Sequence, residues 1–243
     1  MVIRKLILFL AAGSCSVIFG SSIGTNQTTC PVGSLASYEA LASTGCMVSG
    51  VTFNNFSLLA AYSNGVTPTP ASGDILISPN PAVAGLDFAY PVTTRNYVSF
   101  ALQYEFDPPP ATGGTLHLDV LGDVDVFESI CPGGTFSNAP HGCFGRPSDT
   151  SPVNLEVFNE HLGGTKLTDS EPINPPATKG AIQVYFVLNG LPNDPAGFDK
   201  LTSGLTPGVP VGAVPEPKAI GLLLIGLALV CGIQVFAFRH RKA

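Results

Sequence analysis

Residues 97–107 alternate between strongly apolar and more polar side chains, and this period of two constrains the fold more than any other feature. A strand places successive side chains on opposite faces of a sheet, so the alternation predicts a strand with one buried face. The apolar face would carry Val98, Phe100, Leu102, Tyr104 and Phe106. The opposite face would carry Tyr97, Ser99, Ala101, Gln103 and Glu105.

The same pattern recurs along the chain. Residues 181–188 place Ile182, Val184, Phe186 and Leu188 on one side, and residues 51–62 and 74–79 also have the composition of strands. Turn-forming pairs and triplets separate these runs, for example Gly113-Gly114 and Pro108-Pro109-Pro110. Several short strands with frequent turns predict an antiparallel β-sandwich, jelly-roll or immunoglobulin-like, with the strand topology left open.

A short helix is expected near the start of this domain, over residues 34–43. Ser34 can cap it, and Leu35, Tyr38 and Leu41 would share one face. We place the extracytoplasmic sandwich at residues 25–203. The Gly- and Pro-containing residues 204–213 would form an extended linker.

Residues 1–24 have the layout of a secretory signal peptide. Arg4 and Lys5 precede a short apolar run, and small residues follow from Gly20. Lipidation of Cys15 is a less favoured alternative, because the residues before it lack a large aliphatic side chain at the expected place.

Residues 219–238 predict a transmembrane helix. They are 20 residues long with Gln234 as the strongly polar exception, and a helix of that length spans about 30 Å, the thickness of the hydrocarbon core. The basic residues that follow, Arg239, Arg241 and Lys242, would stay on the cytoplasmic side. The sandwich would then lie outside the cytoplasm.

The four residues Val214, Pro215, Glu216 and Pro217 stand directly before this helix. The order of a Pro-Glu-Pro motif, a spanning helix and a basic terminus in residues 214–243 resembles the PEP-CTERM sorting signal. The resemblance implies processing by an exosortase, a membrane-embedded cysteine transpeptidase-like enzyme of Gram-negative bacteria that make exopolysaccharide. It also implies a transient membrane anchor, followed by a place on the cell surface or in the matrix. The prolines fix φ and remove backbone donors, so they would keep the motif extended above the membrane.

Four cysteines remain between the two terminal segments: Cys30, Cys46, Cys131 and Cys143. An even number in an exported chain indicates disulfides, and proximity favours Cys30–Cys46 and Cys131–Cys143 among the three possible pairings. A zinc site is the alternative, but the sequence has no Cys-x-x-Cys pair. No cofactor or metal is expected.

The region between the terminal segments is acidic. It holds sixteen of the 17 acidic residues of the chain and five of the 11 basic ones. Such a surface would repel phosphates, which argues against a nucleic-acid partner.

Candidate chemistry is sparse, and we identify no catalytic residues. His117 with Asp119, and Asp123 with Asp125, would each share a strand face; calcium is the alternative to a solvated surface there. Asp107, Glu156 and Glu160 could belong to a glycosidase carboxylate pair or simply be surface charges. A Gly-x-Ser-x-Gly elbow and a phosphate-binding Gly-rich loop with Lys are both missing from the sequence.

The sequence therefore predicts an exported protein of the cell surface or exopolysaccharide matrix, with a structural or adhesive role. A carbohydrate-binding module of that matrix is the alternative, with exopolysaccharide as a further partner. A secreted polysaccharide hydrolase comes third.

Overall fold

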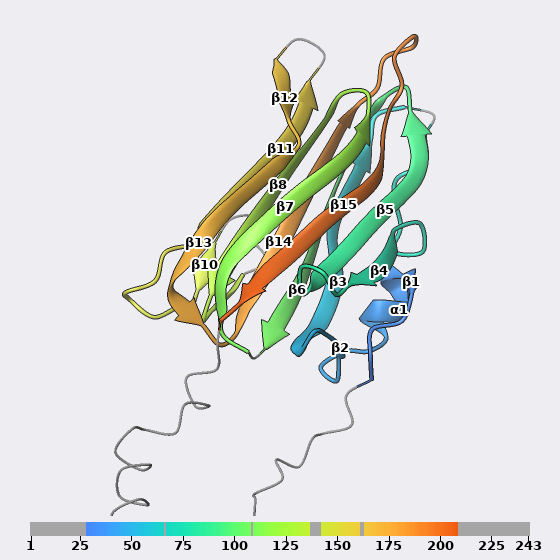
Figure 1. The fold of residues 1–243 in the computed structure, drawn as a ribbon. Coiled ribbons are helices and arrows are strands. Elements are labelled where there is room, and N and C mark those ends of the chain that lie inside the picture. The colour runs from blue at the N-terminus through green and yellow to red at the C-terminus, as the bar shows by residue number, and fades with distance from the viewer. Residues whose placement is uncertain (1–27, 66, 108, 137–141, 161–162, 209–243) are drawn as a thin grey trace, which may run out of the picture.

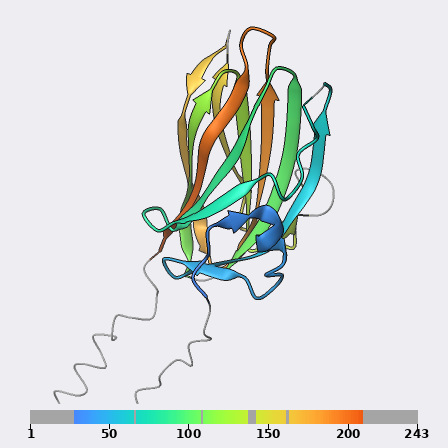
Figure 2. The same cartoon turned by 90° about the vertical axis from the view of Figure 1, so that its right-hand side faces the viewer.

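The protein is described by a computed structural model, which places residues 28–65, 67–107, 109–136, 142–160 and 163–208. These residues form two antiparallel sheets packed face to face (Figures 1 and 2). The expected β-sandwich is confirmed. The predicted signal peptide, the sorting motif 214–217, the helix 219–238 and the basic residues Arg239, Arg241 and Lys242 lie outside the described residues. Within the described part, no helix is both long and apolar enough to cross a membrane.

One sheet has seven strands and the other has six. In spatial order the seven-stranded sheet contains β12 (Gly164–Lys166), β11 (Val153–Glu160), β8 (Val124–Pro132), β14 (Gly180–Asn189), β6 (Tyr97–Asp107), β3 (Val51–Ser63) and β2 (Cys46–Val48). The six-stranded sheet contains β1 (Gly33–Ser34), β4 (Leu76–Asn80), β5 (Gly85–Thr94), β15 (Ala196–Pro207), β7 (Ala111–Leu121) and β13 (Thr168–Ala177). A separate pair is formed by β9 (Thr135–Phe136) and β10 (Cys143–Phe144).

The chain crosses between the sheets at most connections. It alternates from β5 through β6 and β7 to β8, and again from β13 through β14 to β15. The central strands are therefore ordered β11-β8-β14-β6 in one sheet and β5-β15-β7-β13 in the other. This connectivity is that of a jelly roll, one of the two topologies left open by the sequence.

Alternating side chains of both sheets fill the core. All five apolar residues predicted to face inward on β6 are at most 1% exposed, and those of β14 are equally buried. Phe100 and Phe186 stack with ring centroids 4.5 Å apart, and Phe198 from the opposite sheet stacks on Phe186 at 5.1 Å. These contacts across the layers hold the two sheets together.

A short helix and two disulfides complete the fold. Helix α1 (Leu35–Glu39) lies at one end of the sandwich (Figure 2), and the Ser34 hydroxyl accepts a hydrogen bond from the Ser37 amide, as expected of a cap. The helix is shorter than predicted, because residues 40–45 turn back and Gly45 adopts a positive φ of 62° before Cys46. The disulfides Cys30–Cys46 and Cys131–Cys143 are both formed, as proximity predicted.

The predicted start of the linker is wrong. Residues 204–207 continue strand β15, where Gly204 lies opposite both Gly85 and Thr115. A Cβ on Gly204 would lie only 2.8 Å from Thr115 Oγ1 and from Val83, so this glycine permits close packing. The first four residues of the predicted extended linker therefore belong to strand β15, with Gly204 and Leu205 buried, and residues 209–213 lie outside the described part.

Candidate functional site

The outer face of the seven-stranded sheet carries a row of uncharged polar side chains. Strand register places five of them opposite one another on five adjacent strands. The members of this polar row are Ser57 on β3, Gln103 on β6, Gln183 on β14, Ser129 on β8 and Asn154 on β11. Asn154 is exposed and Gln183 is buried, while the other three are half-buried. Amide and hydroxyl groups both donate and accept hydrogen bonds, so the row offers mixed hydrogen-bonding capacity across the sheet.

Aromatic side chains lie beside this row on the same face. Tyr185 of β14 and Phe127 of β8 each lie two residues along their strand from its member of the row, and the two residues are opposite each other. Farther along, the rings of Tyr62 and Tyr97 approach to 6.0 Å between centroids. Tyr62 is 56% exposed and Phe127 is 38% exposed, so rings of this aromatic group reach solvent instead of filling the core.

Hydroxyl groups connect part of the aromatic group. The Ser99 hydroxyl lowers the pKa of Tyr185 by hydrogen bonding, but burial of the phenol and the neighbouring Tyr97 hydroxyl outweigh it. The net result is a pKa above the ordinary value for tyrosine, so the Tyr185 phenol stays a neutral donor at physiological pH. The face thus combines rings with a neutral hydroxyl held in place by its neighbours.

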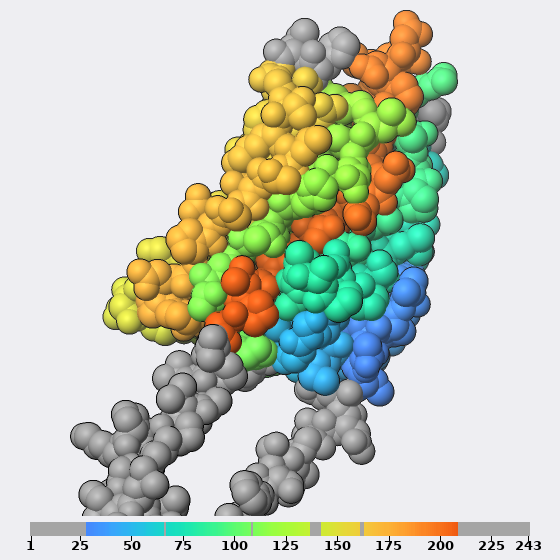
Figure 3. All heavy atoms as spheres, in the orientation of Figure 1, coloured from blue at the N-terminus to red at the C-terminus, as the bar shows by residue number. Residues whose placement is uncertain are grey.

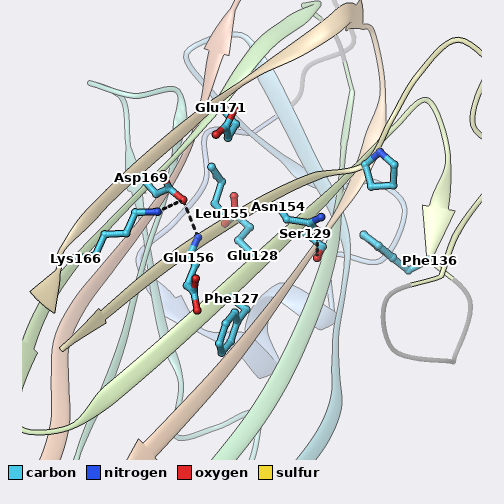
Figure 4. Close-up of a pocket in the computed structure, with 11 residues that line it drawn as sticks. Phe127, Glu128, Ser129, Phe136, Asn154, Leu155, Glu156, Lys166, Asp169 and Glu171 are labelled. Atoms are coloured by element: carbon cyan, nitrogen blue, oxygen red, sulfur yellow. Dashed lines mark hydrogen bonds and ion pairs between the residues drawn. The ribbon is translucent and has the colours of Figure 1, made fainter. Parts of the chain in front are cut away.

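A groove opens where the polar row reaches strand β11 (Figure 4). Its volume is about 560 Å³, and its walls include Phe127, Ser129, Asn154 and Phe136. The Ser129 hydroxyl donates to Asn154 Oδ1 at 2.9 Å, which holds these two side chains of the polar row together. The groove is therefore part of a longer polar and aromatic surface.

An ion pair closes the far side of the groove. Asp169 Oδ2 accepts hydrogen bonds from the Glu156 amide and from Lys166 Nζ, both at 2.9 Å (Figure 4). Burial alone would raise the pKa of Asp169, but these donors and the Ser170 amide outweigh it and lower the pKa. Lys166 is thus already neutralised by a carboxylate of its own chain.

The small β9–β10 pair packs on the same outer face, beyond the polar row. Phe136 of β9 and Cys143 of β10 contact Cys131 and Ala181 of the sheet, and the disulfide Cys131–Cys143 links the pair to β8. This second disulfide therefore fixes one wall of the groove.

The structure separates the two pairs that the sequence offered for calcium. His117 and Asp119 lie 3.3 Å apart on β7 of the six-stranded sheet, where Lys200 also approaches Asp119 to 3.4 Å. Asp123 and Asp125 lie after the crossover to the seven-stranded sheet. Among the described residues, no group of three His, Cys, Asp or Glu side chains could hold a metal ion.

Asp125 belongs to a cluster of carboxylates on the outer face. Burial raises its pKa to about 6, and the negative charges of Glu160, Asp123 and Glu156 add to the rise in that order. Of the carboxylates considered for a glycosidase, Glu156 and Glu160 therefore lie near Asp125, whereas Asp107 lies on β6 and accepts a hydrogen bond from Asn54.

Sequence reasoning missed Glu128, which is 1% exposed and points between the sheets. Burial raises its pKa to about 8, and the nearby Ser203 hydroxyl lowers it slightly. A signal was present, because Glu128 follows Val124 and Val126 at an inward position of an alternating strand. The polar row was missed for another reason: its members become neighbours only through strand register.

The outer face of the six-stranded sheet, formed by β13, β7, β15, β5 and β4, faces the viewer in Figure 3. The aromatic residues of its strands, Phe88, Tyr90 and Phe198, are at most 3% exposed and point into the core. Its central Asp87 is already engaged by the Asn80 amide and the Thr202 hydroxyl. The combination of exposed rings and uncharged polar groups is therefore specific to the seven-stranded sheet in the described part of the chain.

No protein-family model matches the chain, and a search of curated proteins found no match. Among solved structures, it is similar to TmCBM61 in complex with β-1,4-galactotriose, with TM-score 0.31 and 12% identity over 61% of this chain and 88% of that one. It is also similar to the enzymatically active domain of tailspike protein 4 from bacteriophage CBA120, with TM-score 0.30 and 13% identity over 63% of this chain and 19% of that one.

A third similar structure is a family 6 carbohydrate-binding module, with TM-score 0.25 and 14% identity over 60% of this chain and 94% of that one. At these identities and TM-scores, function has to be inferred from the side chains of this chain.

Proposed function

We propose that the sandwich is a carbohydrate-binding domain and that its ligand lies on the outer face of the seven-stranded sheet. One observation carries this proposal: the polar row runs beside exposed aromatic rings on a single face. A sugar ring presents hydroxyl groups at its edge and C–H groups on its faces. Amide and hydroxyl side chains match the hydroxyls, and the π-face of an aromatic ring matches the weakly positive C–H face.

This surface favours binding over a purely structural role. A purely structural protein gains no stability from aromatic rings that are exposed to water, whereas a ligand that covers such rings gains binding affinity. Glu128 is 1% exposed and cannot reach a sugar, whereas Asp125, whose pKa is raised to about 6, lies near Glu160 and Glu156, so hydrolysis is tested separately. Hydrolysis requires two carboxyl groups that both reach the sugar.

The proposal is tested with the full chain, exported from a bacterial host and purified in detergent. Binding is first surveyed on an array of neutral and acidic glycans and is then measured by calorimetry. We expect Phe127→Ala and Tyr62→Ala to weaken binding about fivefold each, because each removes a stacking ring. Leu76→Ala is the matched control, since Leu76 is 44% exposed on the six-stranded sheet.

Two results would decide against the proposal. One is the absence of glycan binding on the array by a folded protein. The other is equal weakening by Leu76→Ala, which would remove the link to this face. Release of new reducing ends during the same incubations would instead indicate a hydrolase.

We further propose that the domain reaches its ligand through export and sorting. The signal peptide at residues 1–24 would direct export, and residues 214–243 would hold the chain in the membrane until an exosortase-type enzyme acts at the Pro-Glu-Pro motif. The cell surface or the exopolysaccharide matrix would be its final location. The two disulfides are consistent with an extracytoplasmic environment.

Sorting is tested by replacing Glu216, Pro215 and Pro217 together with alanine. The variant should stay in the membrane fraction, while the wild type appears at the surface or in the medium. Equal release of both proteins would contradict the role of the motif.

A further inference from the structure

We propose that the glycan bound by this surface is an uncharged chain that crosses the strands, with one sugar unit over each strand of the polar row. This inference rests on the proposed carbohydrate binding and adds the ligand's charge class, its direction and its length. The structure supports it through the charges of the sheet and through the geometry of the row.

The charges on the five strands of the polar row are of one sign, although the exposed Lys179 lies directly before β14 in a pocket with Glu105 and Asp107. Strands β3, β6, β14, β8 and β11 contain no lysine or arginine. Their outward-facing charged residues are all acidic: Glu105, Asp107, Asp125, Glu156 and Glu160. Lys166 on β12 approaches the groove, but its ammonium group is held by Asp169 at 2.9 Å. A chain of uronates, sulfated sugars or phosphorylated sugars would find no free cation on these strands and would be repelled.

The side chains of the polar row itself are uncharged, whereas Glu156, Lys166, Asp169 and Glu171 line the groove at its β11 end. Every member of the polar row is an amide or a hydroxyl, and such groups recognise sugar hydroxyls without requiring a charge on the sugar. Gln183 is only 7% exposed, so Ser57, Gln103, Ser129 and Asn154 supply the groups that a sugar can reach. The acidic residues lie in neighbouring positions and exclude anionic chains. The face thus both attracts neutral sugars and selects against anionic ones.

The direction follows from the register. Residues paired across strands lie on a line perpendicular to the strands, so the polar row crosses five strands from Ser57 to Asn154. At about 4.8 Å between neighbouring strands, the row spans about 19 Å. An extended hexose chain advances by roughly one strand spacing per unit, so the row matches about four or five sugar units.

Two features of the sheet support the same direction. Tyr185 and Phe127 form a second, shorter line of rings beside the row on β14 and β8. The β9–β10 pair lies on the other side of the row, where Phe136 contributes to the groove. A chain laid along a strand would instead run from the rings into this wall.

The first test measures charge selectivity with matched oligomers. The probes are β-1,4-linked mannose tetramers and β-1,4-linked mannuronate tetramers, together with the neutral glycans that bind best on the array. We expect the neutral ligands to bind at least about tenfold more tightly than any uronate at low salt, and added salt should narrow this gap by screening. A uronate oligomer that binds as tightly as the neutral ligands would overturn the charge assignment.

The second test measures direction with the two ends of the row. Ser57→Ala and Asn154→Ala should each weaken binding of the neutral tetramer or pentamer about fivefold, the value of one lost hydrogen bond. Because the two sites are distant, their effects should multiply in the double variant. The same substitutions should weaken the binding of disaccharides much less than that of the tetramer or pentamer. For the wild type, affinity should stop rising once the oligomer exceeds about five sugar units.

The outcomes separate this inference from the proposed function. If no glycan binds the folded wild type, carbohydrate binding itself fails. If glycans bind and only Asn154→Ala weakens them, the ligand is confined to the groove and the cross-strand path is wrong. Thr168→Ala, on the outer face of the six-stranded sheet, is the control variant for both tests.

Discussion

Replacing Glu128 should stabilise the protein, and the gain should depend on pH. Glu128 is 1% exposed, and neither of its carboxyl oxygens has a hydrogen bond of normal geometry within the described residues. The Ser203 hydroxyl is close, but it is already hydrogen-bonded with the Tyr104 hydroxyl at 2.7 Å. The carboxyl group therefore stays protonated in the folded protein at neutral pH.

The magnitude follows from the shift in pKa. Burial raises the pKa of Glu128 from 4.5 to about 8, so the unfolded chain releases this proton at a lower pH than the folded protein does. Between those values the unfolded state binds fewer protons, and stability falls as pH rises. Ionisation of this residue lowers the free energy of unfolding by about 3 kcal/mol at pH 7 relative to pH 4, and by about 5 kcal/mol above pH 8.

The substitution Glu128→Gln keeps the size of the side chain and removes its ionisation. We expect the variant to equal the wild type near pH 4 and to be more stable by about 3 kcal/mol at pH 7. Urea unfolding followed by circular dichroism at several pH values measures this difference. Glu171→Gln, at an exposed position of β13, is the control and should show no such trend. A Glu128→Gln variant that is less stable than the wild type at pH 7, or whose advantage does not change with pH, would refute the reasoning.

Two further predictions concern packing and the groove wall. Gly204→Val should destabilise the fold by about 3 kcal/mol, because a side chain there meets Thr115 and Val83 at 2.8 Å; urea unfolding measures the loss, and an unchanged midpoint would show that this strand is not close-packed. Replacing Cys131 and Cys143 with serine should cost about 3 kcal/mol, since the bridge spans 12 residues. The same pair of substitutions should also weaken glycan binding, and calorimetry that finds full affinity would mean that the β9–β10 wall does not contribute to the site.

The sequence predicted the strands well because burial on one face leaves a period of two. Residues 97–107 and 181–188 appear in the structure with the expected inward faces. The disulfide pairing was also predictable, because both bridges close short loops. Both features depend on residues that are close together in the sequence.

The candidate site was not predictable in the same way, because it depends on register between distant strands. Ser57 lies opposite Gln103 only because β3 contains irregularities between Asn54 and Ser57 and between Leu58 and Ala60. Such bulges change which residues face each other and leave no clear trace in a single sequence. Gly204 shows a related difficulty, since glycine in a flexible linker and glycine in a crowded strand look alike until the neighbours are known.

The most direct test of the proposed binding face is an NMR titration that follows side-chain amide groups of the full chain in detergent. On addition of the best neutral glycan, the NH₂ signals of Gln103 and Asn154 should shift and saturate at the affinity measured by calorimetry. The NH₂ signal of Asn80, on the six-stranded sheet, should stay in place. Saturable glycan binding that moves Asn80 and leaves Gln103 and Asn154 unchanged would contradict the account.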